Sequence, residues 1–305
     1  MKKLLILCLC CLLALGAAAA EETIATLDGS DTVITPIAMD SYNESGAEPD
    51  EASFTENGYS DASIQVEVSR VWVGDACYNV SHVKIAHASQ IRTALAGKLG
   101  KKTNYVWNIA KNHNAVVAIG GEDLAENTGT YTIRQTVVER KKGYAGRDTL
   151  VIDQNGDFHI LTGFSESALS ELTATGVEAI NLFNFGPALV VDGVVQEIPA
   201  KYGVGNVNGI EPRTAIGQVG PLEYILVVVD GRGVKDPTED GGTKASEGAS
   251  LAEVAQFLQE QGCVQAYALD GGGSAVMYFH GEKYSNPSSK RGVSDIIYFA
   301  SAVGE

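Results

Sequence analysis

Alternating apolar and polar positions dominate the chain from about Ala62 onward. Residues Ser63–Val73 (SIQVEVSRVWV) alternate with a period of two and predict a strand, and His82–Ala88 predicts a second strand. The wholly apolar run Ala115–Gly121 predicts a buried strand that ends on two glycines, and the last strand is predicted over Val293–Ala300.

Tight turns separate many of these runs. Three of them, each between two apolar runs, predict hairpins at Gln154–Asp157, Asp192–Gly193 and Gly220–Pro221. Asp153, Asn155 and Asp157 match the start of a calcium-binding loop, but the later Glu that such a loop needs is missing, so a plain turn is favoured. Residues 233–245 are predicted to form a loop.

Three segments show helical periodicity. They are Thr103–Asn114 with Thr103 as its cap, Ser165–Thr175, and the segment that Ser250 and Glu253 open as a capping box and Gly262 ends. Strands outnumber helices and are joined mostly by tight turns. The pattern therefore predicts an α+β fold with a mostly antiparallel mixed sheet flanked by a few helices.

The N-terminal part of the chain has a different composition. Residues 1–20 combine two lysines, a short apolar run and small residues, which predicts a secretory signal peptide rather than a membrane anchor. Residues 21–61 contain eleven acids and no Lys or Arg, which predicts a disordered linker or loosely attached arm. The folded domain is expected at residues 62–305, and the protein is expected to be exported without a stable membrane anchor.

The charge balance narrows the possible partners. A net charge of −16 over 305 residues, without a basic patch, argues against nucleic acid, and any phosphate site must be local. After the predicted signal only Cys77 and Cys263 remain, and they either form one disulfide or stay two buried thiols. The five histidines lack metal-ligand spacing, so neither a metal nor a cofactor is expected. The sequence does not predict the oligomeric state.

The segment ALDGGGSAVMYF (Ala268–Phe279) is the strongest candidate for chemistry. A strand ends in Asp270, followed by Gly271, Gly272, Gly273 and Ser274, and another strand begins. Backbone amides without side chains can form a nest for an anion, while the alternative is a tight turn that Asp270 caps. Further candidates stand near other strand ends: Arg213 for a phosphate, the acids Glu122 and Asp123, Asp230, and Arg291 with Asp295.

Taken in order, several segments resemble the phosphodiester glycosidase family. They are AVVAIGGED, NFGPALVVDG, PRTAIG, VVVDGR, SEGASLAEVAQFLQEQG, ALDGGGSAVMYF and RGVSD, and the resemblance covers roughly residues 81–303. The resemblance implies hydrolysis of a sugar 1-phosphodiester, such as an α-GlcNAc-1-phosphodiester, at the glycosidic C–O bond. It also implies that Arg213 and Asp270 to Ser274 lie in the active cleft, with Asp230 and Asp295 as weaker assignments. One motif departs from the family, because Gly120 stands where an Asn is usual and no aromatic residue follows.

The expected chemistry uses carboxylates beside an anion site. Asp270 would stabilise an oxocarbenium-like transition state or activate water, Glu122 would be the second carboxylate, and Arg213 with the glycine amides would hold the phosphate. Two alternatives remain open. One is a non-catalytic module that binds cell-wall or capsule glycans, and the other is a phosphodiesterase that cuts the P–O bond.

Overall fold

The computed structural model describes residues 24–303, so the predicted signal peptide lies outside the described part of the chain. The three α-helices within it are α1 (Val106–Asn112), α2 (Glu166–Ala174) and α3 (Leu251–Glu260). As predicted, Ser250 and Glu253 form the capping box of α3. The helix α1 begins after Tyr105 rather than at Thr103, and no side chain caps it. No helix in the described residues is long and apolar enough to cross a membrane.

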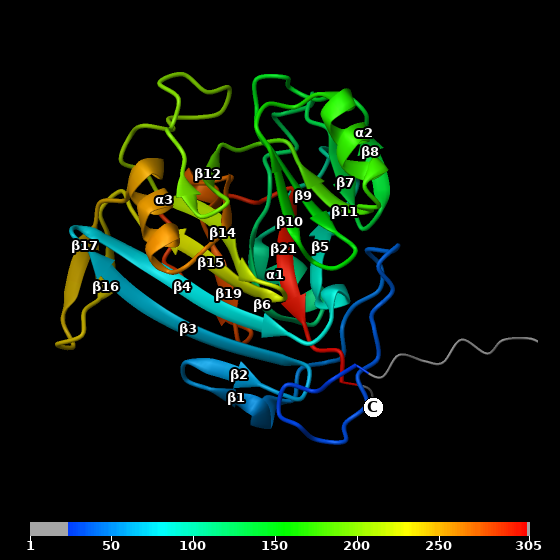
Figure 1. The fold of residues 1–305 in the computed structure, drawn as a ribbon. Helices are drawn as coiled ribbons and strands as arrows, with labels where there is room; N and C mark the ends of the chain where they lie inside the picture. The colour runs from blue at the N-terminus through cyan, green and yellow to red at the C-terminus, as the bar shows by residue number, and fades with distance from the viewer. Residues whose placement is uncertain (1–23, 304–305) are drawn as a thin grey trace, which may run out of the picture.

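The largest sheet has nine strands and runs across the molecule (Figure 1). Its strands, in spatial order, are β1 (Phe54–Thr55), β2 (Gly58–Ser60), β3 (Ile64–Val73), β4 (Ala76–Ile85), β15 (Glu223–Val229), β14 (Arg213–Gly220), β18 (Gln265–Leu269), β12 (Ala188–Val191) and β13 (Val194–Val195).

Two five-stranded sheets and one hairpin complete the fold. The first sheet contains β10 (Phe158–Leu161), β9 (Thr149–Asp153), β11 (Ala179–Phe183), β7 (Thr132–Arg134) and β8 (Val137–Arg140). The second contains β20 (Glu282–Lys283), β19 (Met277–Phe279), β6 (Ala115–Gly120), β21 (Asp295–Ala300) and β5 (Ile91–Leu95). The hairpin of β16 (Val234–Pro237) and β17 (Thr243–Ser246) replaces the predicted loop. The pairings between these strands are antiparallel, which confirms the predicted α+β class.

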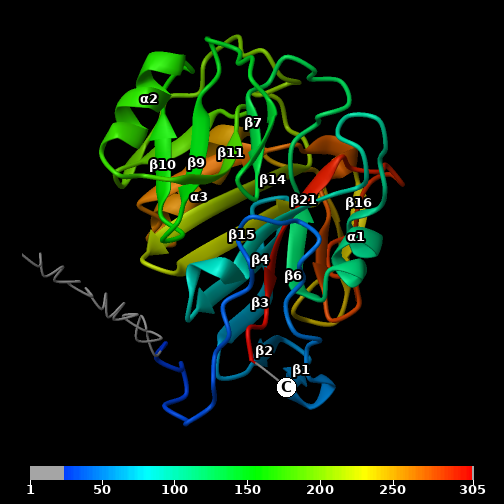
Figure 2. The same ribbon diagram turned by 90° about the vertical axis from the view of Figure 1, so that its right-hand side faces the viewer.

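The strand β15 shows how the layers are held together. Its alternate side chains Leu226 and Val228 enter a core shared with the sheet of β6 and β21, while Ile225 and Val227 enter a second core under α3. Both faces are buried, which explains the unbroken apolar run in the sequence. The helices α1 and α2 cover the outer faces of the five-stranded sheets (Figure 2).

Residues 24–61 differ from the prediction of a disordered arm. Ile34 and Ile37 are buried in the core beneath α1, and β1 and β2 extend the nine-stranded sheet. The buried Arg92 donates from Nη2 to the carbonyls of Ser41 and Glu44 at 2.7 and 3.0 Å. These few apolar contacts and main-chain hydrogen bonds therefore hold residues 24–61 in place, although the composition of the segment is typical of disordered chains.

Two alternatives from the sequence are resolved by the fold. Cys77 and Cys263 are separate, buried free thiols. The turn after Asp153 is an ordinary hairpin, because the Oδ1 atom of Asp153 accepts bonds from the amides of Asn155 and Asp157 at 2.8 and 2.9 Å.

Candidate active site

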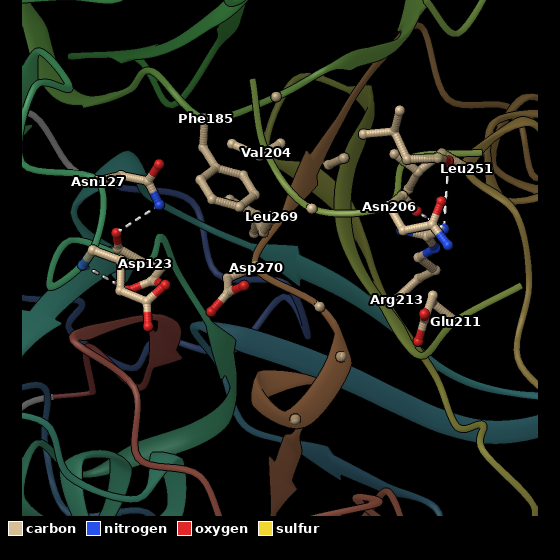
Figure 3. A pocket seen from close by; sticks show the side chains of 18 of the residues that line it. Asp123, Asn127, Phe185, Val204, Asn206, Glu211, Arg213, Leu251, Leu269 and Asp270 are labelled. Atoms are coloured by element: carbon tan, nitrogen blue, oxygen red, sulfur yellow. Dashed lines mark hydrogen bonds between the residues drawn. The ribbon is translucent and has the colours of Figure 1, made fainter. Parts of the chain in front are cut away.

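Three strand ends converge on one open cleft. β18 ends beside the start of β14, where Leu269 pairs with Thr214. The amide of Asp270 donates to the carbonyl of Gly121, just after β6, at 3.0 Å. Side chains next to these ends line a cleft of about 620 Å³, with Asp270 between Asp123 on one side and Arg213 on the other (Figure 3).

The glycine turn forms the floor of the cleft as a short 3₁₀ helix, Gly272–Ser274. A Cβ atom on Gly271 would lie 2.6 Å from the carbonyl oxygen of Pro212, so the close approach of the two backbones requires glycine. The amides of Gly272 and Ser274 donate to backbone carbonyls at 2.8 and 3.0 Å. Within the described residues the amides of Gly271 and Gly273 have no such acceptor, so only two of the four predicted donors remain for an anion.

Asp270 is the carboxylate at the mouth of this turn, and 16% of its side chain is exposed. Burial raises its pKa to about 6, against the opposing effects of the Ser274 hydroxyl and the Arg291 guanidinium. The Ser274 side chain is fully buried behind the turn and does not line the cleft. Asp270 therefore changes its protonation state close to neutral pH, as a catalytic carboxyl group requires.

Asp123 supplies the second carboxylate of the cleft. Its Oδ2 atom accepts from Nη2 of Arg291 at 2.8 Å, and Nη1 of Arg291 lies 3.9 Å from Oδ2 of Asp270. The guanidinium thus links both acids while 41% of its side chain remains exposed. Sequence reasoning noted Asp123 and Arg291 but assigned neither to the site.

Glu122 does not line the cleft, contrary to its predicted role. Its carboxylate lies 3.2 Å from Nη2 of Arg134, and the same nitrogen lies 2.7 Å from Oδ2 of Asp295, with all three side chains fully buried. Burial raises the pKa of Glu122 to about 7 and raises that of Asp295 as well, while Arg134 opposes both shifts. Successive residues of a turn point in different directions, so only Asp123 of this pair faces the substrate side.

This buried ion cluster positions the turn that carries Asp123. The Oδ1 atom of Asp295 accepts from the Glu122 amide at 2.8 Å, and its carbonyl accepts from the Gly121 amide at 3.0 Å. A Cβ atom on Gly121 would lie 2.5 Å from that carboxylate, which explains the glycine. At Gly120 a Cβ atom would lie 3.1 Å from the Ser274 carbonyl, so the departure from the family pattern abuts the glycine turn.

Arg213 lines the cleft, but most of its hydrogen-bonding capacity is already used. Its Nε donates to the carbonyl of Ala249 and its Nη2 to that of Asn206, both at 2.8 Å. Burial lowers its pKa to about 10. Only Nη1 lacks an acceptor among the residues described, so Arg213 cannot present a two-pronged fork to a phosphate. Its replacement should loosen the fold as well as the site.

Asp230 lies away from the cleft, at the end of β15, and is almost fully buried. Its Oδ2 atom accepts from Nδ2 of Asn79 at 2.6 Å, and both oxygens accept from the amide of Asn286 at 3.0 Å. Asp230 is therefore held by neutral donors and is not among the residues that line the cleft, and its substrate-binding role stays a prediction.

Several cleft residues escaped the sequence reasoning. Arg232 follows β15, reaches to within 3.2 Å of the Cβ position of Gly272, and pairs with Glu211 while 49% of its side chain stays exposed. Phe185, Val204 and Leu269 form an apolar part of the lining near Asp270 (Figure 3). The VVVDGR motif contained Arg232, but reasoning from that motif concentrated on its acid.

The cleft places carboxylates, Asp270 and Asp123 among them, beside donors for an anion, and these are the kinds of group that glycoside hydrolases use. The chain belongs to the phosphodiester glycosidase family, whose model matches residues 108–300. The resemblance found in the sequence is thereby confirmed.

The chain is similar to known proteins over parts of their length. The chain is 28% identical over 199 residues to the SPbeta prophage-derived uncharacterized protein YomE of Bacillus subtilis, covering 63% of this chain and 29% of that protein. It is 40% identical over 82 residues to N-acetylglucosamine-1-phosphodiester alpha-N-acetylglucosaminidase of Bos taurus, covering 27% of this chain and 14% of the relative. The chain thus spans less than a third of the length of either protein.

The fold also matches a solved structure, the catalytic domain of the zebrafish N-acetylglucosamine-1-phosphodiester alpha-N-acetylglucosaminidase auto-inhibited by its pro-peptide. The TM-score is 0.58 at 21% identity, and the match covers 78% of this chain and 82% of that chain. At this identity the likeness supports the shared fold.

Proposed function

We propose that the protein is an exported hydrolase that cleaves a sugar 1-phosphodiester, such as an α-GlcNAc-1-phosphodiester, at the glycosidic C–O bond. The observation that carries the proposal is Asp270, a nearly buried carboxyl group with a pKa of about 6 at the mouth of a bare glycine turn. Family membership and the activity for which the bovine relative is named support the same chemistry.

The phosphate would bind at the glycine turn. The amides of Gly271 and Gly273 are the backbone donors left for it, and two arginines line the cleft beside the turn, Arg232 near Gly272 and Arg291 near Gly273. Both guanidinium groups are paired with acids but remain substantially exposed, so they can also contact a bound anion. This arrangement gives a local anion site within an acidic protein and assigns Arg213 a supporting role.

The sugar would lie between the two carboxylates. A water oxygen adds to the anomeric carbon, the C–O bond to the phosphate breaks, and the water proton passes to Asp270 or the solvent. The departing phosphate monoester takes the bonding electrons and needs little protonation, because it is already a fair leaving group. Asp270 stabilises the positive charge that develops on the sugar, and Asp123 replaces Glu122 as the second carboxylate.

An α-GlcNAc-1-phosphodiester assay with the protein lacking residues 1–20 tests this proposal. We expect free GlcNAc and a phosphate monoester from the wild-type protein, and a loss of at least about a hundredfold in kcat for Asp270→Asn with anion binding retained. Asp75→Asn is the matched control, since that carboxylate is exposed, pairs with Lys244, and is not among the residues that line the cleft. Equal turnover by Asp270→Asn would remove Asp270 from the mechanism.

Hydrolysis in ¹⁸O-labelled water identifies the bond that breaks. Label in the sugar is expected for C–O cleavage, whereas label in the phosphate would show a phosphodiesterase. Glycan binding without release of product would instead favour a binding module, the alternative that the change at Gly120 suggested. Export is tested separately, by N-terminal sequencing of the protein recovered outside the cells.

A further inference from the structure

A second cluster of reactive side chains lies behind the cleft, at the end of the nine-stranded sheet. It contains Cys77 on β4, Asp230 after β15 and Asp236 on β16. One ligand atom from each residue lies within 4.8 Å of the other two. All three side chains are buried, with exposed fractions of 0%, 1% and 1%. The distant Cys77 thus meets Asp230 and Asp236, which are neighbours in the sequence, and the fold brings a thiol and two carboxylates together away from water.

The protein supplies little positive charge to this cluster. Within the described residues, the donors to the Asp230 carboxylate are neutral, namely the Asn79 amide group and the backbone amide of Asn286. Arg70 is the positive group that influences Asp236, but its Nη2 donates to the Tyr284 carbonyl and its guanidinium lies over the Tyr284 ring. Two buried carboxylates without a bound cation are costly unless they share a proton or bind a metal.

Unpartnered oxygens in the same place point to a ligand. Both carboxylate oxygens of Asp236 are inaccessible and have no donor in good hydrogen-bond geometry within the described residues, although the Asn286 side chain and the Asp230 carboxyl group lie close enough to influence the pKa of Asp236. Asn79, which contacts Asp230, also leaves its Oδ1 atom buried without a donor. Buried acceptors in native proteins are satisfied in the great majority of cases, and a cation bound here would satisfy these oxygens together.

We propose that Cys77, Asp230 and Asp236 bind one divalent transition-metal ion of the zinc class. Carboxylate oxygens alone would suit calcium or magnesium, but a thiolate ligand selects a softer ion, and zinc accepts both oxygen and sulfur ligands. The site differs from the cleft and does not rest on the proposed hydrolase activity. It is a structural site, since none of its ligands lines the cleft.

Binding would reverse the protonation of the cluster. The thiolate, not the thiol, is the form of Cys77 that can bind a metal ion. The metal ion takes the sulfur lone pair as the S–H proton leaves to solvent, together with any proton that the two acids share. Affinity should therefore rise with pH.

The site would also stabilise one wall of the cleft. Arg232 lies two residues after Asp230 and lines the cleft, and its amide donates to the carbonyl of Glu247 beside β17 at 3.2 Å. A metal ion that joins β4, the end of β15 and β16 would fix the hairpin that carries this contact. Metal removal should consequently lower the thermal stability of the protein.

Cobalt and zinc titrations of the reduced, metal-stripped protein test the proposal. We expect one equivalent of either ion to bind, a thiolate-to-cobalt charge-transfer band to appear, and zinc to raise Tm by several degrees. The band and the rise in Tm should disappear in Cys77→Ser and in Asp236→Asn. Cys263→Ser is the matched control because Cys263 is the other buried free thiol and lies outside the cluster, and it should behave like the wild type.

Other outcomes would overturn the assignment. These are the absence of stoichiometric binding, a cobalt band that persists in Cys77→Ser, or a calcium response without a cobalt band. Should Cys77→Ser fail to fold, Asp236→Asn still tests the site, because it removes the charge of the Asp236 side chain and keeps its shape. If Asp236→Asn raises Tm and the wild-type protein binds neither zinc nor cobalt, a proton shared between Asp230 and Asp236 explains the cluster instead.

Discussion

Asp270 is the residue whose environment most directly sets the proposed chemistry. Its carboxyl group acts in the ionised form, and burial raises its pKa to about 6. We therefore expect kcat/KM to fall about tenfold for each pH unit below 6 and to level off above it. A pH profile with the phosphodiester substrate checks this. A rate that instead declines as the pH rises through 6 would make Asp270 a general acid.

Arg291 should determine the pH below which kcat/KM falls, that is, the position of the acidic limb of the pH profile. Its guanidinium lowers the pKa of Asp270, so Arg291→Gln is expected to move the limb upward by roughly half a unit to one unit. Arg291→Lys keeps the charge and should move it less. The profiles of the two variants are compared with that of the wild type, and an unmoved limb in Arg291→Gln would show that the two groups are not coupled.

At this scale the sequence identified the right kinds of residue more reliably than their roles. The position of Asp270 at a strand end before three glycines was enough to place it at the cleft. The direction of a side chain was not predictable. Glu122 and Asp123 are adjacent in the sequence, but Glu122 joins the buried cluster with Arg134 and Asp295 while Asp123 lines the cleft. The role of Arg213 was hard to predict for a similar reason, since its carbonyl partners come from two loops, one seven residues before it and one 36 residues after it.

The glycine turn is an element whose shape can be tested directly. In Gly271→Ala the new methyl group would meet the backbone of Pro212, so we expect a loss of about 1–3 kcal/mol in the free energy of unfolding and at least about tenfold in kcat/KM. Gly220→Ala is the control, since a Cβ atom there has no neighbour within 4 Å. Urea denaturation and kinetics measure both effects. Equal behaviour of the two variants would contradict the close approach.

The ion cluster beneath the Asp123 turn makes a second prediction at the level of elements. Arg134→Met leaves Glu122 and Asp295 buried together, so we expect a loss of about 3–5 kcal/mol in the free energy of unfolding. Burial raises the pKa of Glu122 from 4.5 to about 7, so the folded state retains its proton, and stability falls as the pH rises through this interval. The variant should therefore be destabilised more at pH 8 than at pH 5, as denaturation at both values would reveal. A pH-independent loss would argue against uncompensated carboxylates.

The accuracy of the predicted elements followed the strength of local signals. The capping box of α3 and the hairpin turns are local features, and the structure contains them. The strands β7, β8, β16 and β17 are short and largely polar, and they depend on partners that no local pattern reveals. The proposed metal cluster was invisible for the same reason, because its ligands stand on three separate elements.

For the whole molecule, the segment 24–61 shows where composition fails as a guide. Its charge and its small polar residues predict disorder, yet Ile34 forms a bridge to Val303 and Ala47 to Ser301 along the C-terminal end of the chain. The segment therefore closes the fold by joining its two ends. An average over the segment does not reveal that two isoleucines, Ile34 and Ile37, pack against the apolar core beneath α1.

Deletion of residues 24–49 should consequently destabilise the protein while sparing its chemistry. The deletion uncovers the core that Ile34 and Ile37 occupy and removes the carbonyl partners of Arg92, and burial of each isoleucine contributes roughly 1.5–3 kcal/mol. We expect a loss of at least about 3 kcal/mol in the free energy of unfolding. Because these residues do not line the cleft, kcat/KM per folded molecule should be unchanged at low temperature.

Ile37→Ser offers a milder version of the same change, and Val33→Ser, at a position 73% exposed, is its control. If the truncated protein keeps the wild-type Tm, the segment is the loosely attached arm that its composition suggests, and the contacts with residues 301–303 contribute little to stability.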